Sequence, residues 1–589
     1  MNTKILFLTV TLGFTSLACE DYLKEEFVTD VGYAYFETEA GIEDAVKGIY
    51  PVLKEFWVRE PAMCMAEFGT DEFTRGINDP NVGTFYDDYD NYGSSLDPHT
   101  QYIHDLWDNF YKGINIANSV LYYAPGVKFI NPALKEQRIG EAGFLRALLY
   151  FVLVRQFGDV PLKTEPSFGP EREFYRAPVA DVYKQIISDL RTAESKLPVS
   201  QANFGRPRKG AAQHLLALVY LTRASAETTI RGSAATDLDS AVYYSELVIN
   251  SGNYSLEADY KTIFNYYNLN GTDNPNSKEV IFSIQNTNDP LINGIGSRLH
   301  LFYIGRYDAQ PGMKRDLFNH APWRRAHPTD YALDAYDRGN DSRLYKSLKM
   351  AWICNNPATA PKDGGVPRFG LGDTALYITL HKNVPAGNVG LTSYKWVPWS
   401  IQGGRSTFDD ELWPSLNKFY DYHIPTVNYY TGFRDFMIYR FAETYLIAAE
   451  AHGRKGNYSQ AVTYINIVRT RAAYKTGEVK PKEFYTVEGG NIADLTVSTV
   501  PQMQITEAAI NSPELLVNFI LDERLRELLG ENHRWFDLVR CGKLIERVQA
   551  HSHRGAGIQP HHKLRPIPQR TYLDRLQVPN PEAQQNPGY

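Results

Sequence analysis

Cysteine is scarce in this chain, and its scarcity excludes several classes of protein. Only four cysteines occur among 589 residues. They are too far apart to form a zinc knuckle or a CxxC redox pair. A dense disulfide scaffold is also excluded, and a chain of this size does not need one because it can bury a large core.

The chain also lacks an excess of positive charge. It carries 61 Lys and Arg against 68 Asp and Glu, for a net charge of −7, and no block of basic residues. A nucleic-acid-binding protein normally presents a basic patch to the phosphate backbone. We therefore expect no nucleic-acid partner.

Sequence motifs of the common enzyme classes are missing as well. No G-x-S-x-G, HExxH, GxxxxGK[ST] or GxGxxG pattern occurs, so we expect neither an enzyme nor a cofactor. The segment from Asp88 to Gly93 begins like a calcium-binding EF-hand loop, but His99 stands where the bidentate Glu would be, and we expect no metal site. Because carboxylates are plentiful, a glycosidase pair stays open as an alternative.

Long apolar runs are absent apart from one at the N-terminus. The run from Ile5 to Leu12 is too short to cross a bilayer and has the form of a secretory signal peptide, which we place at residues 1–18. Leu17-Ala18-Cys19 resembles the bacterial lipobox, in which the cysteine is lipidated. We expect a lipid on Cys19 and a tether over residues 19–38; a plain secretory signal with an incidental cysteine is the alternative.

Apolar periodicity predicts that most of the remaining chain is helical. The ranges expected to be helical are 38–56, 99–123, 136–157, 178–196, 210–226, 237–251, 436–454, 458–472, 513–529 and 533–548. Residues 456–461 read Gly-Asn-Tyr-Ser-Gln-Ala, and this turn resembles that of tetratricopeptide repeats, where a glycine frees the turn and a small alanine lets two helices approach. We predict a mainly α fold with about four helical hairpins in one scaffold.

The middle of the chain has a different character. Residues 252–435 are rich in Gly, Pro, Asn and aromatic residues, with short strands expected at 279–284 and 375–379. Irregular segments of this length usually carry function. We predict an irregular lobe at 252–435, set between an N-terminal helical region at 39–251 and a C-terminal one at 436–589.

Aromatic residues are unusually abundant, with 40 Tyr, 29 Phe and 8 Trp. A sugar offers C–H faces to exposed rings and hydroxyl groups to neighbouring polar side chains. Three stretches combine both kinds of residue, at 75–92, 293–323 and 394–413. The candidate ligand-binding residues are Arg75, Asn78, Asp79, Tyr86, Tyr89, Tyr92, Arg298, Tyr303, Tyr307, Trp323, Trp396 and Trp399. The alternative is that these rings pack locally in the core, as we expect for Trp107 and Trp535.

An ordered series of segments resembles the SusD/RagB family of outer-membrane lipoproteins. The segments are Gly69-Thr70-Asp71-Glu72-Phe73, Gly140 to Ala147, Val154 to Pro161, Pro328-Thr329, Asp341-Ser342-Arg343, Tyr439 to Glu443, Glu523 to Leu528, His533 to Leu538, Pro566 to Gln569 and Gln585 to Tyr589. Leu525 departs from the family pattern, which usually has Arg there. Gly530 and Asn532 replace the usual Phe and Gly around Glu531, but Asn tolerates a left-handed backbone, so we expect the helix to end there as in the family.

The resemblance implies a surface-exposed lipoprotein of the cell outer membrane that binds an oligosaccharide. It would cover a SusC-type TonB-dependent barrel, with its helical repeats toward the barrel and its ligand site in loops of the irregular region. Family contacts typically come from regions like the first two aromatic stretches, but no single family residue is carried over. Open alternatives are a peptide ligand, as in the RagB branch, a structural lid without a ligand, and a hydrolase.

Overall fold

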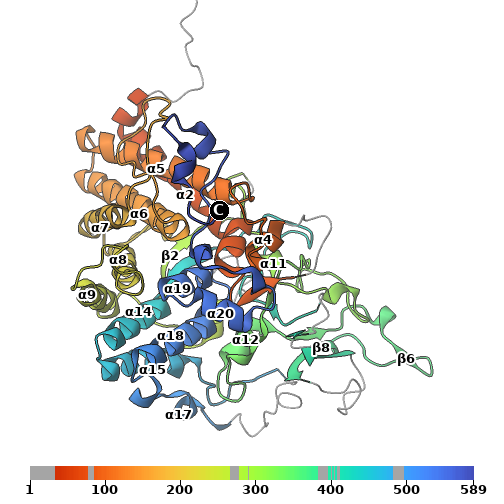
Figure 1. Cartoon of the computed structure of the whole chain (residues 1–589). Coiled ribbons are helices and arrows are strands. Elements are labelled where there is room, and N and C mark those ends of the chain that lie inside the picture. The colour runs from red at the N-terminus through yellow and green to blue at the C-terminus, as the bar shows by residue number, and fades with distance from the viewer. Residues whose placement is uncertain are drawn as a thin grey trace, which may run out of the picture.

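The structure is a computed structural model of the whole chain, shown in Figure 1. It describes residues 33–76, 85–264, 277–289, 291–382, 395–399, 401–402, 405–406, 412–481 and 496–589. Cys19, Asn78 and Asp79 therefore lie outside the described residues, as do the side chains of Trp396 and Trp399. Within the described part, no helix is both long enough and apolar enough to cross a membrane.

The long helices pack in chain order into one curved stack. In the N-terminal half they are α2 (Glu39–Trp57), α5 (Ile103–Tyr123), α6 (Pro132–Phe157), α7 (Val179–Lys196), α8 (Lys209–Arg223) and α9 (Asp237–Ile249). The C-terminal half adds the long helices α14 (Phe441–Arg454), α15 (Tyr458–Ala472) and α18 (Pro513–Leu528). It also contains the shorter helices α17 (Val500–Met503), α19 (Arg534–Arg540) and α20 (Leu544–His551). Each helix from α5 to α9 packs on the next, α9 packs on α14, and α14 packs on α15 and α18. Figure 1 shows this stack along one side, which confirms the predicted mainly α scaffold of helical hairpins.

The turn between α14 and α15 has the predicted repeat geometry. Gly456 has a φ of +82°, a conformation that costs glycine little. The Asn457 side chain accepts a hydrogen bond from the Gln460 backbone and caps α15. Ala461 is fully buried between the helices. The small residue and the free turn together let the two helices lie close.

Two of the predicted helical ranges contain more than a single helix in the structure. Residues Phe436–Arg440 form strand β13, paired antiparallel with β2 (Val280–Ile284), and the helix begins only at Phe441. The β-branched and aromatic residues here pair with a partner that is remote in sequence, which local periodicity does not reveal. The helix expected over 533–548 is two helices, because the chain turns at Gly542 with a φ of +71°.

Helix α18 ends where we expected it to end, although Gly530 and Asn532 replace the residues that are usual in the family. The helix stops at Leu528, and Gly530 and Asn532 both have left-handed backbones, with φ of +74° and +63°. The Asn532 side chain donates a hydrogen bond to the backbone carbonyl of Trp57 at 3.1 Å. The predicted helix stop is confirmed.

The middle of the chain forms a lobe of loops and short elements on the opposite side from the stacked helices (Figure 1). Its helices are α10 (Tyr260–Ile263), α11 (Leu299–Phe302), α12 (Asp330–Asp334) and α13 (Arg343–Ser347). Its strands are β3 (Ala326–Pro328), β4 (Leu348–Lys349), β5 (Ala351–Ile353), β6 (Lys362–Asp363), β7 (Val366–Pro367), β8 (Thr374–Lys382), β9 (Lys395–Trp399), β10 (Ile401–Gln402), β11 (Arg405–Ser406) and β12 (Ser415–Leu416). Strand β3 pairs with β1 (Phe73–Arg75), which joins the lobe to the N-terminal region. The two short strands expected from the sequence are found as β2 and β8, while the division at 252 and 435 stays a prediction.

A buried network of charged side chains joins the lobe to the stack. Arg440 on β13 contacts Glu527 of α18 at 2.6 Å, Glu279 at 3.0 Å and Glu531 at 2.7 Å. Arg343 of α13 reaches the same Glu527 at 2.9 Å. All five side chains are at most 2% exposed. Because a buried charge without a partner is very costly, each member of this network depends on the others.

We expect Arg440→Met to lower the free energy of unfolding by about 3–5 kcal/mol, because buried carboxylates would lose their counter-charge. Urea denaturation of the full chain measures this change. Arg368→Met is the matched control, since Arg368 pairs with Asp363 in solvent and its loss should leave the denaturation midpoint in place. Equal midpoints for the two variants would contradict the proposed role of the network.

The same network predicts a loss of stability in acid. Against the effect of burial, the neighbouring arginines lower the pKa of Glu527 from its ordinary value of 4.5 to about 2. A carboxyl group whose pKa is lower in the folded state stabilises the fold above about pH 4.5, and this stabilisation is lost as the pH falls toward 2. The unfolding free energy should therefore drop more steeply between pH 5 and pH 3 in the native chain than in Glu527→Gln. Parallel pH profiles would exclude this role for Glu527.

Candidate functional site

One aromatic surface of the lobe is built on the segment that precedes strand β3. The backbone N–H of Trp323 donates to the carbonyl of Leu301 at 3.0 Å, and that of Arg325 donates to the carbonyl of Phe302 at 2.8 Å. These bonds fix the segment along α11. Between them, Arg324 has a left-handed backbone with a φ of +56°, a conformation that is uncommon outside glycine and is often found at functional positions.

Two aromatic rings from remote segments meet on this surface. The ring centroids of Trp323 and Tyr430 are 5.3 Å apart, with planes inclined at 55°. Tyr430 is 49% exposed, and Trp323 is partly exposed. We name this pair, with Arg298, Arg325 and Glu60, the Trp323–Tyr430 surface. Two inclined rings that are partly exposed to solvent can contact a ligand from more than one side.

Guanidinium groups lie beside the Trp323 ring. The central carbon of Arg325 is 5.1 Å from the ring centroid, and that of Arg298 is 5.7 Å away. Arg325 also donates to the hydroxyl of Tyr86 at 3.1 Å, and Arg298 donates to Glu60 at 3.0 Å. These bonds hold the two cations in place, and a guanidinium has further N–H groups that can bind the hydroxyl groups of a ligand.

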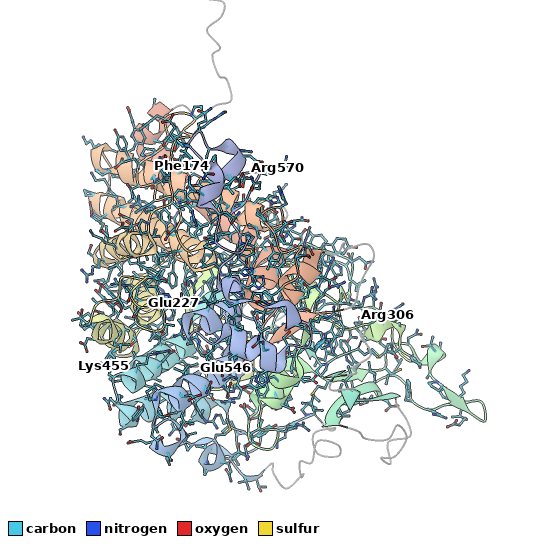
Figure 2. All side chains as sticks on the ribbon, viewed as in Figure 1. Phe174, Glu227, Arg306, Lys455, Glu546 and Arg570 are labelled. Carbon is cyan, nitrogen blue, oxygen red and sulfur yellow. The ribbon has the colours of Figure 1, made fainter. Side chains whose placement is uncertain are left out.

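Positive charge accumulates at the edge of the surface. Arg59 pairs with Glu60 at 3.7 Å, so Arg59 and Arg298 share one carboxylate. Burial lowers the pKa of Arg59, and the nearby charge of Arg298 lowers it further. Arg306, labelled in Figure 2, is an exposed residue elsewhere on the lobe. A ligand here would meet donors more often than acceptors, which suits hydroxyl-rich molecules.

Five of the predicted aromatic contact residues are buried, and their rings are not available to a ligand. Tyr86, Tyr89, Tyr92, Tyr303 and Tyr307 are each at most 3% exposed. The expectation that they form open platforms is therefore wrong.

The stretch around Tyr86 is a helix, which explains why its rings point inward. Helix α4 (Phe85–Asn91) places Tyr86 and Tyr89 three residues apart on one face. Tyr89 donates its hydroxyl to the carbonyl of Gln101, and Tyr92 donates to the carbonyl of Gly69 at 2.6 Å. Burial raises the pKa of Tyr92 to about 12. The i, i+3 spacing of Tyr86 and Tyr89 is the feature of the sequence that could have identified them as core residues.

Packing in the lobe accounts for the other two buried tyrosines. The Tyr307 ring stacks on Trp352 with centroids 4.2 Å apart and planes inclined by 8°. Its hydroxyl donates to the carbonyl of His320 at 2.5 Å. Tyr303 contacts Phe73 edge to face at 5.1 Å. These rings form the core of the lobe, and Trp107 and Trp535 are buried as expected, at 4% and 0% exposed.

The other predicted contact residues have separate positions. Arg75 lies on β1, is 5% exposed, and forms an ion pair with Asp87 of α4. Arg298 and Trp323 belong to the Trp323–Tyr430 surface. The sequence reasoning missed Tyr430, since it lies outside the three aromatic stretches; the adjacent tyrosines at 429 and 430 were its only local signal.

Metal binding has no support in the described part of the chain. No three His, Cys, Asp or Glu side chains gather there closely enough to hold a metal ion. The histidines at 551, 553, 561 and 562, which lie close together in the sequence, form ring contacts, such as the stacking of His551 on Tyr331 with centroids 3.8 Å apart.

Comparison of the sequence with known protein families identifies the family to which the chain belongs. A family model described as the SusD family matches residues 248–589. The chain belongs to the SusD family. A second model, described as starch-binding associating with outer membrane, matches residues 30–221. The resemblance stated from the sequence is confirmed.

Individual relatives of the SusD family extend over nearly the whole chain. SusD-like protein P25 of Formosa agariphila is 25% identical over 595 aligned positions, which cover 98% of this chain and 97% of the relative. A laminarin-binding SusD-like protein of known structure has a TM-score of 0.62 and 22% identity, covering 94% of this chain and all of its own. Surface glycan-binding protein A from Bacteroides fluxus has a TM-score of 0.61 and 20% identity, covering 94% and 99%. At these identities the solved structures establish the shared fold.

Proposed function

We propose that this chain is a non-catalytic binding protein that captures oligosaccharides at the Trp323–Tyr430 surface. The observation that carries the proposal is the exposed pair of inclined rings with Arg298 and Arg325 beside it. Rings contact the C–H faces of a sugar and guanidinium groups bind its hydroxyls. Relatives with the same fold include proteins named as laminarin-binding and surface glycan-binding, which supports a glycan as the ligand.

We further propose that the chain delivers its ligand to a TonB-dependent outer-membrane barrel and is anchored through a lipid on Cys19. The family description of association with the outer membrane supports this location. Binding should be weak, because a hydrogen bond to a sugar hydroxyl replaces one to water and contributes a net free energy of only about 0.5–1.5 kcal/mol. Weak binding suits a protein that must release its ligand to a transporter.

Trp323→Ala and Tyr430→Ala should each weaken oligosaccharide binding by roughly tenfold, because each removes one of the two exposed rings, a loss of about 1.4 kcal/mol. Isothermal titration calorimetry against laminarin, malto-oligosaccharides and other glycans measures the affinity. Tyr243→Ala is the matched control, since Tyr243 is 58% exposed but lies on α9, on the far side of the stack from the lobe (Figure 1).

The results of these titrations distinguish an error in the proposed site from an error in the proposed function. If the native chain binds a glycan and all three variants bind it equally well, the function stands and the site lies elsewhere. If no glycan binds but short peptides do, the oligosaccharide proposal is wrong.

Cys19→Ser should release the protein from the outer-membrane fraction, because the lipid chains supply the anchoring energy, at about 0.8 kcal/mol per buried CH₂ group. Membrane fractionation followed by immunoblotting measures the distribution, and Cys541→Ser controls for the general effect of losing a cysteine. Retention of the Cys19 variant in the membrane would exclude the proposed anchor.

A further inference from the structure

A cavity lies in the helical stack, away from the Trp323–Tyr430 surface. It has a volume of about 360 Å³ and lies where α6, α7 and α8 meet α19 and the C-terminal segment. Glu227, labelled in Figure 2, is one of its lining residues. Its apolar walls are formed by Val154, Val179, Tyr183, Ile230, Val539 and Leu564. A volume above about 300 Å³ is typical of sites that bind small molecules.

Arg155 lines this cavity and holds an unusual position in it. Its guanidinium carbon is 3.8 Å from the ring centroid of Phe151 and 4.0 Å from that of Phe536, so the planar group lies between two rings. Its Nε donates to the backbone carbonyl of Phe151 at 2.9 Å. No described residue accepts a hydrogen bond from its two terminal amino groups or forms an ion pair with it.

The other cations at the cavity already have partners. Arg540 pairs with Glu450 at 2.7 Å, and Lys563 pairs with Glu227 at 2.6 Å. Arg231 donates to the carbonyl of Thr222 at 2.9 Å. Arg155 is therefore the cation that the described part of the wall leaves without a carboxylate. Burial lowers the pKa of Arg155, and the more distant charges of Asp537 and Glu443 oppose this effect.

We propose that this cavity binds a carboxylate with a compact apolar body, either a short free acid or the C-terminal residue of a peptide chain. The two terminal amino groups of Arg155 can hold both oxygens of one carboxylate, which is the strongest pairing a guanidinium makes. The apolar walls bury the rest of the ligand. A neutral sugar would find too few polar partners there, and this site is independent of glycan capture.

Calorimetry on the purified full-length protein in non-ionic detergent tests the proposal. Hexanoate should bind, and hexanamide, which has the same shape without the charge, should bind at least tenfold more weakly. Acetyl-Ala-Leu with a free carboxylate is compared with its amide in the same way. Tighter binding of the peptide acid than of hexanoate identifies a chain terminus as the source of the ligand, and the reverse identifies a free acid.

Arg155→Met keeps most of the side-chain volume and removes the charge, and it should weaken binding of the acid by about 10- to 100-fold. Arg172→Met is the matched control, because Arg172 is exposed and does not line the cavity. Thermal unfolding shows whether the Arg155 variant is folded.

Ile230→Glu provides a second test that does not disturb the core. Ile230 is 60% exposed and lines the cavity, so a carboxylate placed there should repel or replace the ligand. Absence of binding by either acid, equal binding of acid and amide, or native affinity in Ile230→Glu would overturn the proposal.

Discussion

The buried carboxylate of Glu527 is paired with three arginines from different parts of the chain. Arg343 of the lobe, Arg440 of strand β13 and Arg471 of α15 all form ion pairs with its carboxylate. These elements are far apart in sequence, and α18, which carries Glu527, packs on α14 in the stack. Because a buried carboxylate is stable only when its counter-charges are in place, the position of the lobe is coupled to the position of the helices.

The same principle holds along the inner side of the C-terminal helices. Arg534 of α19 pairs with Asp71 at 2.6 Å, and Arg524 of α18 pairs with Glu443 at 2.8 Å. Asp71 lies just before β1, which pairs with β3, and β3 directly follows Trp323 and Arg325. The exposed rings are thus connected, through one short sheet and one buried ion pair, to the rigid part of the molecule. Pre-organisation of this kind lowers the entropy cost of binding.

Sequence patterns predicted the helices well because each helix of the stack buries one face against its neighbours. The range expected at 458–472 is the observed α15, and the range at 178–196 differs from α7 by a single residue. Strand β13 was not predicted because its partner β2 is remote in the chain. The residues of the candidate site were harder to predict, since a tyrosine in a loop and a tyrosine in a core look alike in sequence. Tyr307 and Tyr430 differ only in what the rest of the fold places over them.

Helix α9 packs directly against α14, although the whole lobe lies between them in the chain. The two ends of this long insertion are therefore held together by the scaffold itself, and the intervening loops do not have to close the gap. Loop length adds only slowly to the entropy cost of such a closure. Evolution can accordingly lengthen, shorten or exchange these loops while the supporting architecture stays unchanged.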